Sequence, residues 1–401
     1  MIIMLRRGLL VLVALSLASA FVSAAQAAAH EETSVLRFEA PEGRRLALEN
    51  LAGSILIQPA DGAALELEAR TFAEADTAAQ AASLARSVRL DVAEGDRQIS
   101  VLARYPVEEH RVFIYQAEGI GRFSHRARYH DETVLLTSDP DRKGARVHTD
   151  FLLKLPPGVA VKIDNRAGSM EAADISADLY LASGYGSLDI ANVTGKAMLD
   201  TGSAPVRVRD HRGSVVADTG SGAVLIEGLV GDASADTGSG RVTYRNVEGD
   251  VHADTGSGSV NLENVAAGRI HADTGSGSVF LENVTGSLHA DTGSGSVRAE
   301  NFFAGASVVV DTGSGSVSLS GNLAEVERLD IDTGSGGVQL ATAQLPSLHL
   351  RAEAGSGSVD VDLPALSHVR ADNDYFEADI GDGEGEGIIN TGSGSIRMRM
   401  H

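Results

Sequence analysis

Eight copies of Asp-Thr-Gly-Ser are the residues of this sequence that could most directly do chemistry. The same four residues carry the catalytic carboxylate in aspartic proteases of the pepsin-like and retroviral kinds, which need two such carboxylates sharing one proton. Here the copies recur at a near-constant spacing, which indicates a structural repeat. We therefore predict a turn, fixed by an amide hydrogen bond to the Asp carboxylate, and no acid protease activity. The aspartates are Asp200, Asp218, Asp236, Asp254, Asp273, Asp291, Asp311 and Asp332.

Two columns of residues within this repeat are candidates for holding metal ions. Calcium prefers clustered carboxylate and hydroxyl oxygens, and zinc binds imidazoles. The calcium candidates are Asp254, Asp273 and Asp291. The zinc candidates, each two residues before one of these aspartates, are His252, His271 and His289. Each repeat brings only one carboxylate to this corner, so we expect solvated turns, exposed histidines and no bound cofactor.

The repeat that must position these side chains is 18–21 residues long and starts at residue 164, counted from its Asp-like position. The residues one before that position, and six and eight after it, are apolar or aromatic in every unit. Ala253, Val260 and Leu262 are one such set. A catalytic site would not require this pattern, whereas a core shared by all units would.

Within each unit, apolar and polar residues alternate with period two between glycine-rich segments, which predicts two short strands joined by turns. We predict an all-β protein, a flattened parallel β-solenoid of about 13 laps stacked about 4.8 Å apart, right-handed by the crossover rule. The sixth-residue pattern of left-handed β-helices and the nonapeptide of calcium β-rolls are absent. A column of asparagines should hydrogen-bond along the rod. It consists of Asn246, Asn264, Asn283 and Asn301.

The residues before the repeat divide into two further segments. Residues 1–28 combine two arginines, an apolar run and small residues, which is typical of a secretory signal peptide. Residues 29–160 alternate like strands around an alanine-rich helix at 73–87, and we expect this region to cap the first lap of the solenoid at 161–401.

The two ends of the repeat region carry signals of their own. Residues 49–55, ENLAGSI, match the repeat frame as an isolated unit. On the last strand, Arg397 and Arg399 should place charge on an exposed edge and discourage pairing with other chains.

Composition narrows the classes of function. A formal net charge of −22 disfavours nucleic acid and anionic membrane surfaces as partners. The absence of cysteine excludes disulfides, a lipid-anchored cysteine and thiol catalysis. No second long apolar stretch follows residues 1–28, so we expect no transmembrane segment in the mature chain.

Three motifs carry a family resemblance beyond the leader: RRLALENLAGSILI, LPPGVAVKIDNRAGSMEAADI and the iterated DTGSGSV…LENV.G laps. With these, the chain resembles the bacterial putative-adhesin family labelled domain of unknown function 4097. The resemblance implies an exported β-solenoid without assigned catalytic residues.

Two functions from different classes fit the sequence. The first is an exported, non-enzymatic, adhesin-like protein of the periplasm, cell envelope or extracellular space. Its long faces would bind an unknown envelope or extracellular macromolecule, or act as a spacer. The alternative is a carbohydrate-active enzyme on a parallel β-helix, which usually has longer laps and a cleft of charged loops. Here the only lap insertions lie within 300–350 and add one to three residues each, which favours the first function.

Overall fold

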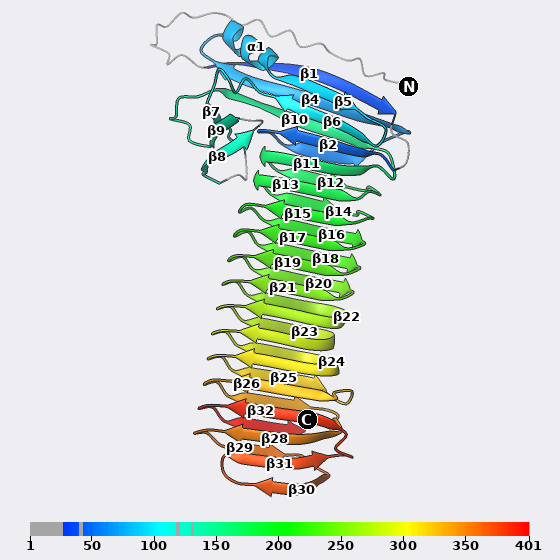
Figure 1. Ribbon diagram of the computed structural model, residues 1–401, viewed down its shortest axis with the longest axis vertical. Helices are drawn as coiled ribbons and strands as arrows, with labels where there is room; N and C mark the ends of the chain where they lie inside the picture. Colours follow the sequence, from blue (N-terminus) through cyan, green and yellow to red (C-terminus); the bar gives the residue numbers. More distant parts are fainter. Residues whose placement is uncertain (1–26, 40–42, 118–120, 130–131, 401) are drawn as a thin grey trace, which may run out of the picture.

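The computed structural model describes residues 27–39, 43–117, 121–129 and 132–400 (Figure 1). The predicted signal peptide at 1–28 lies outside these ranges except for its last two residues. In the described ranges, no helix is both long and apolar enough to cross a membrane.

Most of the described chain is a parallel β-solenoid of about 12 turns, which confirms the predicted fold class. Each turn places one strand in a sheet that we call the A sheet and one in a second sheet, the B sheet (Figure 1). The A strands before the middle of the rod are β2 (Arg45–Asn50), β11 (Ala160–Ala167), β13 (Leu179–Tyr185), β15 (Ala197–Thr201), β17 (Val215–Thr219), β19 (Ala233–Thr237) and β21 (Val251–Thr255). The matching B strands are β3 (Ile55–Pro59), β12 (Met170–Ala173), β14 (Leu188–Ala191), β16 (Val206–Arg212), β18 (Val224–Val230) and β20 (Val242–Glu248).

In the middle of the rod, a B strand runs on into the next A strand without a break. These longer strands are β22 (Val260–Thr274), β23 (Val279–Thr292) and β24 (Val297–Thr312), and β25 (Val317–Asn322) follows them. Alternation sends every second side chain inward, so Val260, Leu262 and Ala272 are buried while their neighbours face solvent. Equivalent residues of successive laps pair in register, as Val260 does with Val279, and stack into one continuous core.

The Thr-Gly-Ser-Gly corner, where each A strand turns into a B strand, is fixed by the threonine. Thr255 Oγ1 donates to the carbonyl of Gly240 in the preceding lap (2.9 Å) and accepts from the amide of Gly258 (3.0 Å). A Cβ on Gly258 would lie 1.7 Å from the Gly240 oxygen, so only glycine fits there. The corner is a turn, as predicted, but its fixing group is a buried threonine hydroxyl instead of the aspartate carboxylate.

The opposite corner carries the predicted asparagine column, and the structure confirms it. Asn264 donates from Nδ2 to Asn246 Oδ1, and the next two asparagines repeat this bond, each at 3.1 Å. All four have φ between 51° and 55°, the left-handed region that asparagine tolerates better than most residues. The column therefore combines a tight bend with a ladder of amide hydrogen bonds along the rod.

The N-terminal region covers the first lap, which is the isolated unit formed by β2 and β3. Its strands are β1 (Ala28–Glu39), β4 (Ala64–Ala75), β5 (Arg89–Glu94), β6 (Gln98–Arg104), β7 (Val112–Ile114), β8 (Ser124–Tyr129), β9 (Glu132–Thr137) and β10 (Arg146–Leu155). Strand β6 pairs with β2, and β10 pairs with β3, both in parallel. The helix α1 (Ala78–Ser87), capped by Thr77 and Gln80, packs on β1 and β4.

Buried hydrogen bonds join this cap to the first laps. Asn50 Nδ2 donates to the carbonyl of Thr149 (3.0 Å) and to Oδ1 of Asn165 (3.2 Å). The Tyr105 hydroxyl donates to the carbonyl of Ala52 (2.8 Å). Because buried polar groups are costly when unpaired, this network fixes how the cap sits on the stack.

The sequence repeat places its last three units at residues 353, 372 and 390, but these units do not stack as successive laps. The strands concerned are β26 (Arg328–Thr333), β27 (Val338–Thr342), β28 (Leu348–Ala354), β29 (Val359–Asp362), β30 (Leu366–Ala371), β31 (Tyr375–Ile380), β32 (Gly385–Thr391) and β33 (Ile396–Met400). The C-terminal lap, β32 and β33, lies between two earlier laps, because Asn390 pairs with both Asp332 and Glu353 (Figure 1). The unit at 372 is no parallel lap but an antiparallel hairpin of β30 and β31.

A physical reason for the inserted lap lies in the corner threonine. Thr391 Oγ1 donates to the carbonyl of Gly336 (2.8 Å), as the corner threonines do elsewhere in the stack, whereas the lap of β28 has Ala354 at this position and cannot do so. Since parallel pairing needs only matching alternation, the lap with the hydroxyl takes the inner place. Arg397 and Arg399 are therefore not on an edge strand as expected; β33 lies between β27 and β29, and both arginines contact Asp360.

Candidate binding face

The outward surface of the A sheet, which we call the A face, carries three parallel columns of side chains. Successive laps stack in register, so equivalent residues line up along the rod. The eight Asp-Thr-Gly-Ser aspartates form one column, which we call the ladder. A second column, two residues before the ladder on each strand, we call the stripe. The stripe consists of Tyr180, Met198, Val216, Ser234, His252, His271, His289 and Val309.

The stripe is apolar at both ends and aromatic in its middle. Tyr180, Met198 and Val216 are 41%, 42% and 42% exposed, although large apolar side chains are usually buried. Further along, the imidazoles of His252 and His271 stack at 4.5 Å between ring centroids, and the ring of His289 continues the stack at 4.9 Å. The stripe is therefore a continuous, weakly polar surface on an otherwise acidic protein.

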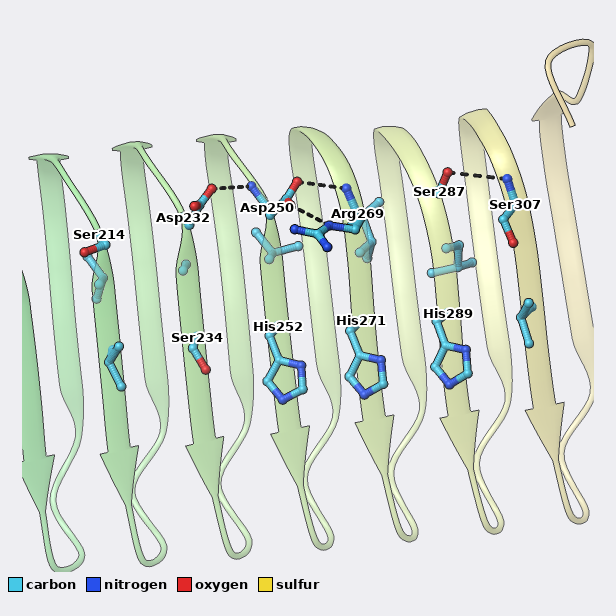
Figure 2. Close-up of a pocket in the computed structure, with 17 residues that line it drawn as sticks. Ser214, Asp232, Ser234, Asp250, His252, Arg269, His271, Ser287, His289 and Ser307 are labelled. Atoms are coloured by element: carbon cyan, nitrogen blue, oxygen red, sulfur yellow. Dashed lines mark hydrogen bonds and ion pairs between the residues drawn. The ribbon is translucent and has the colours of Figure 1, made fainter.

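A groove of about 520 Å³ follows the stripe from β17 to β24 (Figure 2). Val251, Ile270 and Leu288 contribute to its floor, and the three histidines point along one side. The opposite rim includes Asp232 and Asp250, and the carboxylate of Asp250 pairs with Arg269 at 2.9 Å. The backbone amide of Arg269, and then its guanidinium, lower the pKa of Asp250. The groove is open along the rod, so its shape suits an elongated ligand.

The ladder is a column of like charges that the chain itself does not neutralise. Across the described ranges, none of its eight carboxylates forms an ion pair with Lys, Arg or His. Partial burial, and then the charges of Asp254 and Asp291, raise the pKa of Asp273 above its ordinary value. The pKa values of Asp218 and Asp311 are raised for the same reasons. Folding thus forces these carboxylates together against their mutual repulsion.

The central histidine of the stripe, His271, is biased toward the neutral form. Partial burial, and then the positive charge that His252 and His289 would carry, lower the pKa of His271, while Asp273 and Asp254 act in the opposite direction. A neutral imidazole at His271 is compatible with an apolar surface.

The outward surface of the B sheet, the B face, also carries charged columns, but there several of the charges are paired with opposite ones. Arg245 Nε contacts Glu263 Oε2 across neighbouring laps at 2.7 Å, and Arg207 pairs with Asp189 at 3.5 Å. Arg298 and Glu300 form a further pair. The two faces therefore differ in charge balance, although they belong to the same laps.

Comparison with known proteins agrees with this architecture over the middle of the chain. The family model described as Toastrack DUF4097 matches residues 153–322. Those residues are similar to the Toastrack family. The match starts on β10 and ends with β25, so it covers the groove and most of the ladder. The family resemblance inferred from the sequence is confirmed.

Two solved structures were also found, both distant from this chain. One is a putative cell adhesion protein from Clostridium sporogenes ATCC 15579, 9% identical over 93% of this chain and 100% of that chain, with a TM-score of 0.16. The other is a putative adhesin from Parabacteroides distasonis ATCC 8503, 10% identical over 92% and 97%, with a TM-score of 0.23. No curated protein matches the chain.

The laps place the predicted metal candidates in columns instead of in clusters. Within the described ranges, no group of three His, Cys, Asp or Glu side chains has the geometry to hold a metal ion. The rings of His252, His271 and His289 are parallel to within 7°, and their lone pairs lie in the ring planes. Parallel rings 4.5–4.9 Å apart cannot direct two nitrogens at one zinc ion about 2.0–2.1 Å away. The calcium candidates are also spread along the rod, one per lap, because they lie in register on successive strands. They are Asp254, Asp273 and Asp291.

The stripe is the feature of this face that sequence motifs do not reveal. Its members share no residue type, so a search for known catalytic or metal-binding patterns does not detect them. Aligning the laps on the aspartate and reading the column two residues earlier would have found it, because that column changes from Tyr to Met, Val, Ser and His with no Asp, Glu, Lys or Arg between Lys162 and Asp330.

Proposed function

We propose that this chain is an exported, non-enzymatic, adhesin-like module that binds an envelope or extracellular macromolecule along its A face. The observation that carries the proposal is the exposed stripe beside an unneutralised ladder, continuous over many laps. A long contiguous apolar surface on a soluble protein commonly marks an interaction site. The B face, with its paired charges, would face solvent and give the rod its length as a spacer.

Export rests on the sequence of residues 1–28, which has the pattern of a secretory signal peptide. The chain has no cysteine, so the fold does not depend on the redox state of the compartment it reaches. Its acidity favours solubility outside the cytoplasm as well as inside it.

The enzymatic alternative has less support from the site. Acid-base catalysis by two carboxyl groups needs surroundings that separate their pKa values into an acid and a base. The ladder instead repeats the same surroundings from lap to lap, each aspartate following an inward residue and preceding a buried threonine. We expect purified protein not to cleave a denatured protein at low pH. Cleavage that Asp254→Asn abolished would overturn this assignment.

Cell fractionation with matched variants tests the proposed function. Val216→Arg with Ser234→Arg would place two charges on neighbouring residues of the stripe. Leu225→Arg with Thr243→Arg would place two on neighbouring residues of the B face, in the same laps. We expect the first pair to release the protein from the envelope fraction into the soluble fraction, and the second pair to leave its distribution unchanged. Equal distributions for both pairs would contradict a binding role for the A face.

A further inference from the structure

We infer that the A face receives a cationic amphipathic helix of a partner protein, which lies along the groove with its apolar side on the stripe and its basic side chains on the ladder. This inference rests on the proposed function and specifies the partner's chemistry. It draws on three properties of the A face: its apolar surface, its charge and its period.

The apolar surface selects an amphipathic partner over a purely charged one. Val216, His271 and Val309 line the groove together with the buried floor residues beneath them. At roughly 25 cal/mol per Å² of apolar area removed from water, only a partner with apolar side chains would gain from covering the stripe. A polyamine or a lone cation would contact the ladder and leave the stripe exposed to water.

The charge selects a cationic partner. The ladder lies two residues from the stripe along each strand, and in the described part of the chain none of its carboxylates forms an ion pair with Lys, Arg or His. Asp232 adds a carboxylate on the other rim of the groove. Burial, and then repulsion between neighbouring aspartates, raise the pKa of Asp218 and Asp273, and basic side chains placed there would relieve the repulsion. Complementary charge of this kind also speeds encounter and excludes acidic partners.

The period selects a helix over an extended strand. Equivalent side chains on the A face recur every 4.5–4.9 Å, as the histidine ring centroids show. A helix presents one side chain per 5.4 Å turn on a given face, whereas a β-strand presents one about every 6.6–6.8 Å. Over three laps the helix therefore stays near register, while the strand shifts by more than one lap. Helices that fill an apolar groove with one anchor per turn are a common recognition mode.

The test uses the full chain and synthetic peptides of about 18 residues, five helical turns. One peptide of Leu and Lys has the two residue types on opposite sides of a helix. A second has the same composition in strict alternation, which favours a strand. A third replaces Lys with Glu in the helical pattern. Binding is followed by fluorescence anisotropy at low and at physiological salt. We expect the helical Lys peptide to bind at least tenfold more tightly than either of the others.

Matched variants of the protein show which face binds. Asp254→Asn with Asp273→Asn and Asp291→Asn removes three stacked carboxylates from the A face. As its control, Glu263→Gln with Glu282→Gln and Glu300→Gln removes three from the B face of the same region. We expect the first variant to bind the helical peptide about tenfold more weakly at low salt, and the second to bind it as the wild type does.

The possible results separate the two proposals. Equal binding of the helical and alternating peptides, or equal losses in the two variants, would overturn the inferred helix partner. So would unchanged peptide binding in Val216→Arg with Ser234→Arg, because the stripe would then have no part in recognition. If the peptides fail but the stripe variant still leaves the envelope fraction, the helix inference is wrong and the proposed function stands.

Discussion

The A and B faces are built from the same laps with the same alternation, yet they place their charges differently. On the B face, Arg245 and Glu263 neutralise each other across neighbouring laps at 2.7 Å. On the A face, Asp254 lies in register with Asp236 and Asp273, and like charges face like charges. The backbone imposes neither arrangement, because both columns point into solvent from strands of the same kind.

This difference indicates that the ladder has a role in binding. An arginine one lap away is enough to satisfy an acidic residue, and the B face does this at two places along the rod. The A face leaves a repulsion in place that a single substitution per lap could remove. A residue pattern that costs stability without a structural reason is expected at functional surfaces. The comparison therefore supports the A face as the surface that a partner completes.

The largest effect should come from the core that the two faces share. Val260 is fully buried between the sheets, whereas Ser259 beside it is partly exposed. We expect Val260→Asp to destabilise the protein by about 3–5 kcal/mol, because an uncompensated charge would be buried. Ser259→Asp should change stability by no more than about 0.5 kcal/mol. Thermal unfolding followed by circular dichroism measures both. Similar losses would mean that the assignment of inward and outward residues is wrong.

An engineered disulfide tests whether the last strand of the B sheet, β33, lies between β27 and β29. Gln339 pairs with Arg397 in the adjacent strand, so Gln339→Cys with Arg397→Cys should close a disulfide on oxidation and stabilise the fold by roughly 2–4 kcal/mol. Because Asp360 is one strand further away, Gln339→Cys with Asp360→Cys should remain reduced. Thiol titration distinguishes them, and since the chain has no other cysteine the result is free of side pairings. A disulfide in the second variant alone would restore the sequential order of laps.

Removing one carboxylate from either face should change the melting temperature by a smaller amount, and in opposite directions or not at all on the B face. Asp273→Asn should raise the melting temperature, because it removes a carboxylate whose pKa is raised by burial and like charges. Glu263→Gln should leave it unchanged or lower it, because Glu263 pairs with Arg245. Each change should be below about 1 kcal/mol.

The dependence of stability on pH should also show that the ladder carboxylates are less favourable when ionised. The folded protein binds protons to Asp218, Asp273 and Asp311 more tightly than the unfolded chain, so their contribution to stability grows as pH falls through their raised pKa values and is lost as pH rises. In Asp273→Asn this gain on acidification should shrink. A melting temperature that falls in Asp273→Asn would show that the carboxylate stabilises the fold.

The smallest effect concerns calcium. Because the ladder offers one carboxylate per lap at this corner, we expect calcium and sodium at matched ionic strength to change the melting temperature equally, through screening alone. A saturable rise specific to calcium would indicate binding to the native state. If that rise disappeared when Asp254, Asp273 and Asp291 were replaced by Asn, the ladder would be a calcium site.

The sequence predicted the solenoid and the asparagine column because both follow from a period that every lap repeats. It did not predict the inserted C-terminal lap, since any lap can pair with any other when their alternation matches. The strand pairings, such as those of Asn390 with Asp332 and Glu353, reveal the order. The buried hydroxyl of Thr255 was missed for a related reason: sequence alone does not say which of two neighbouring polar residues turns inward.

The most direct test of the A face as a binding surface is cysteine accessibility in the cell. Ser234→Cys lies on the stripe and Thr243→Cys on the B face of the same region, and both parent side chains are partly exposed. In purified protein a maleimide should label the two cysteines at similar rates. In cells that carry the protein, a bound partner should slow labelling of Ser234→Cys severalfold and leave Thr243→Cys unaffected. Equal labelling of both cysteines in cells and in purified protein would contradict the account.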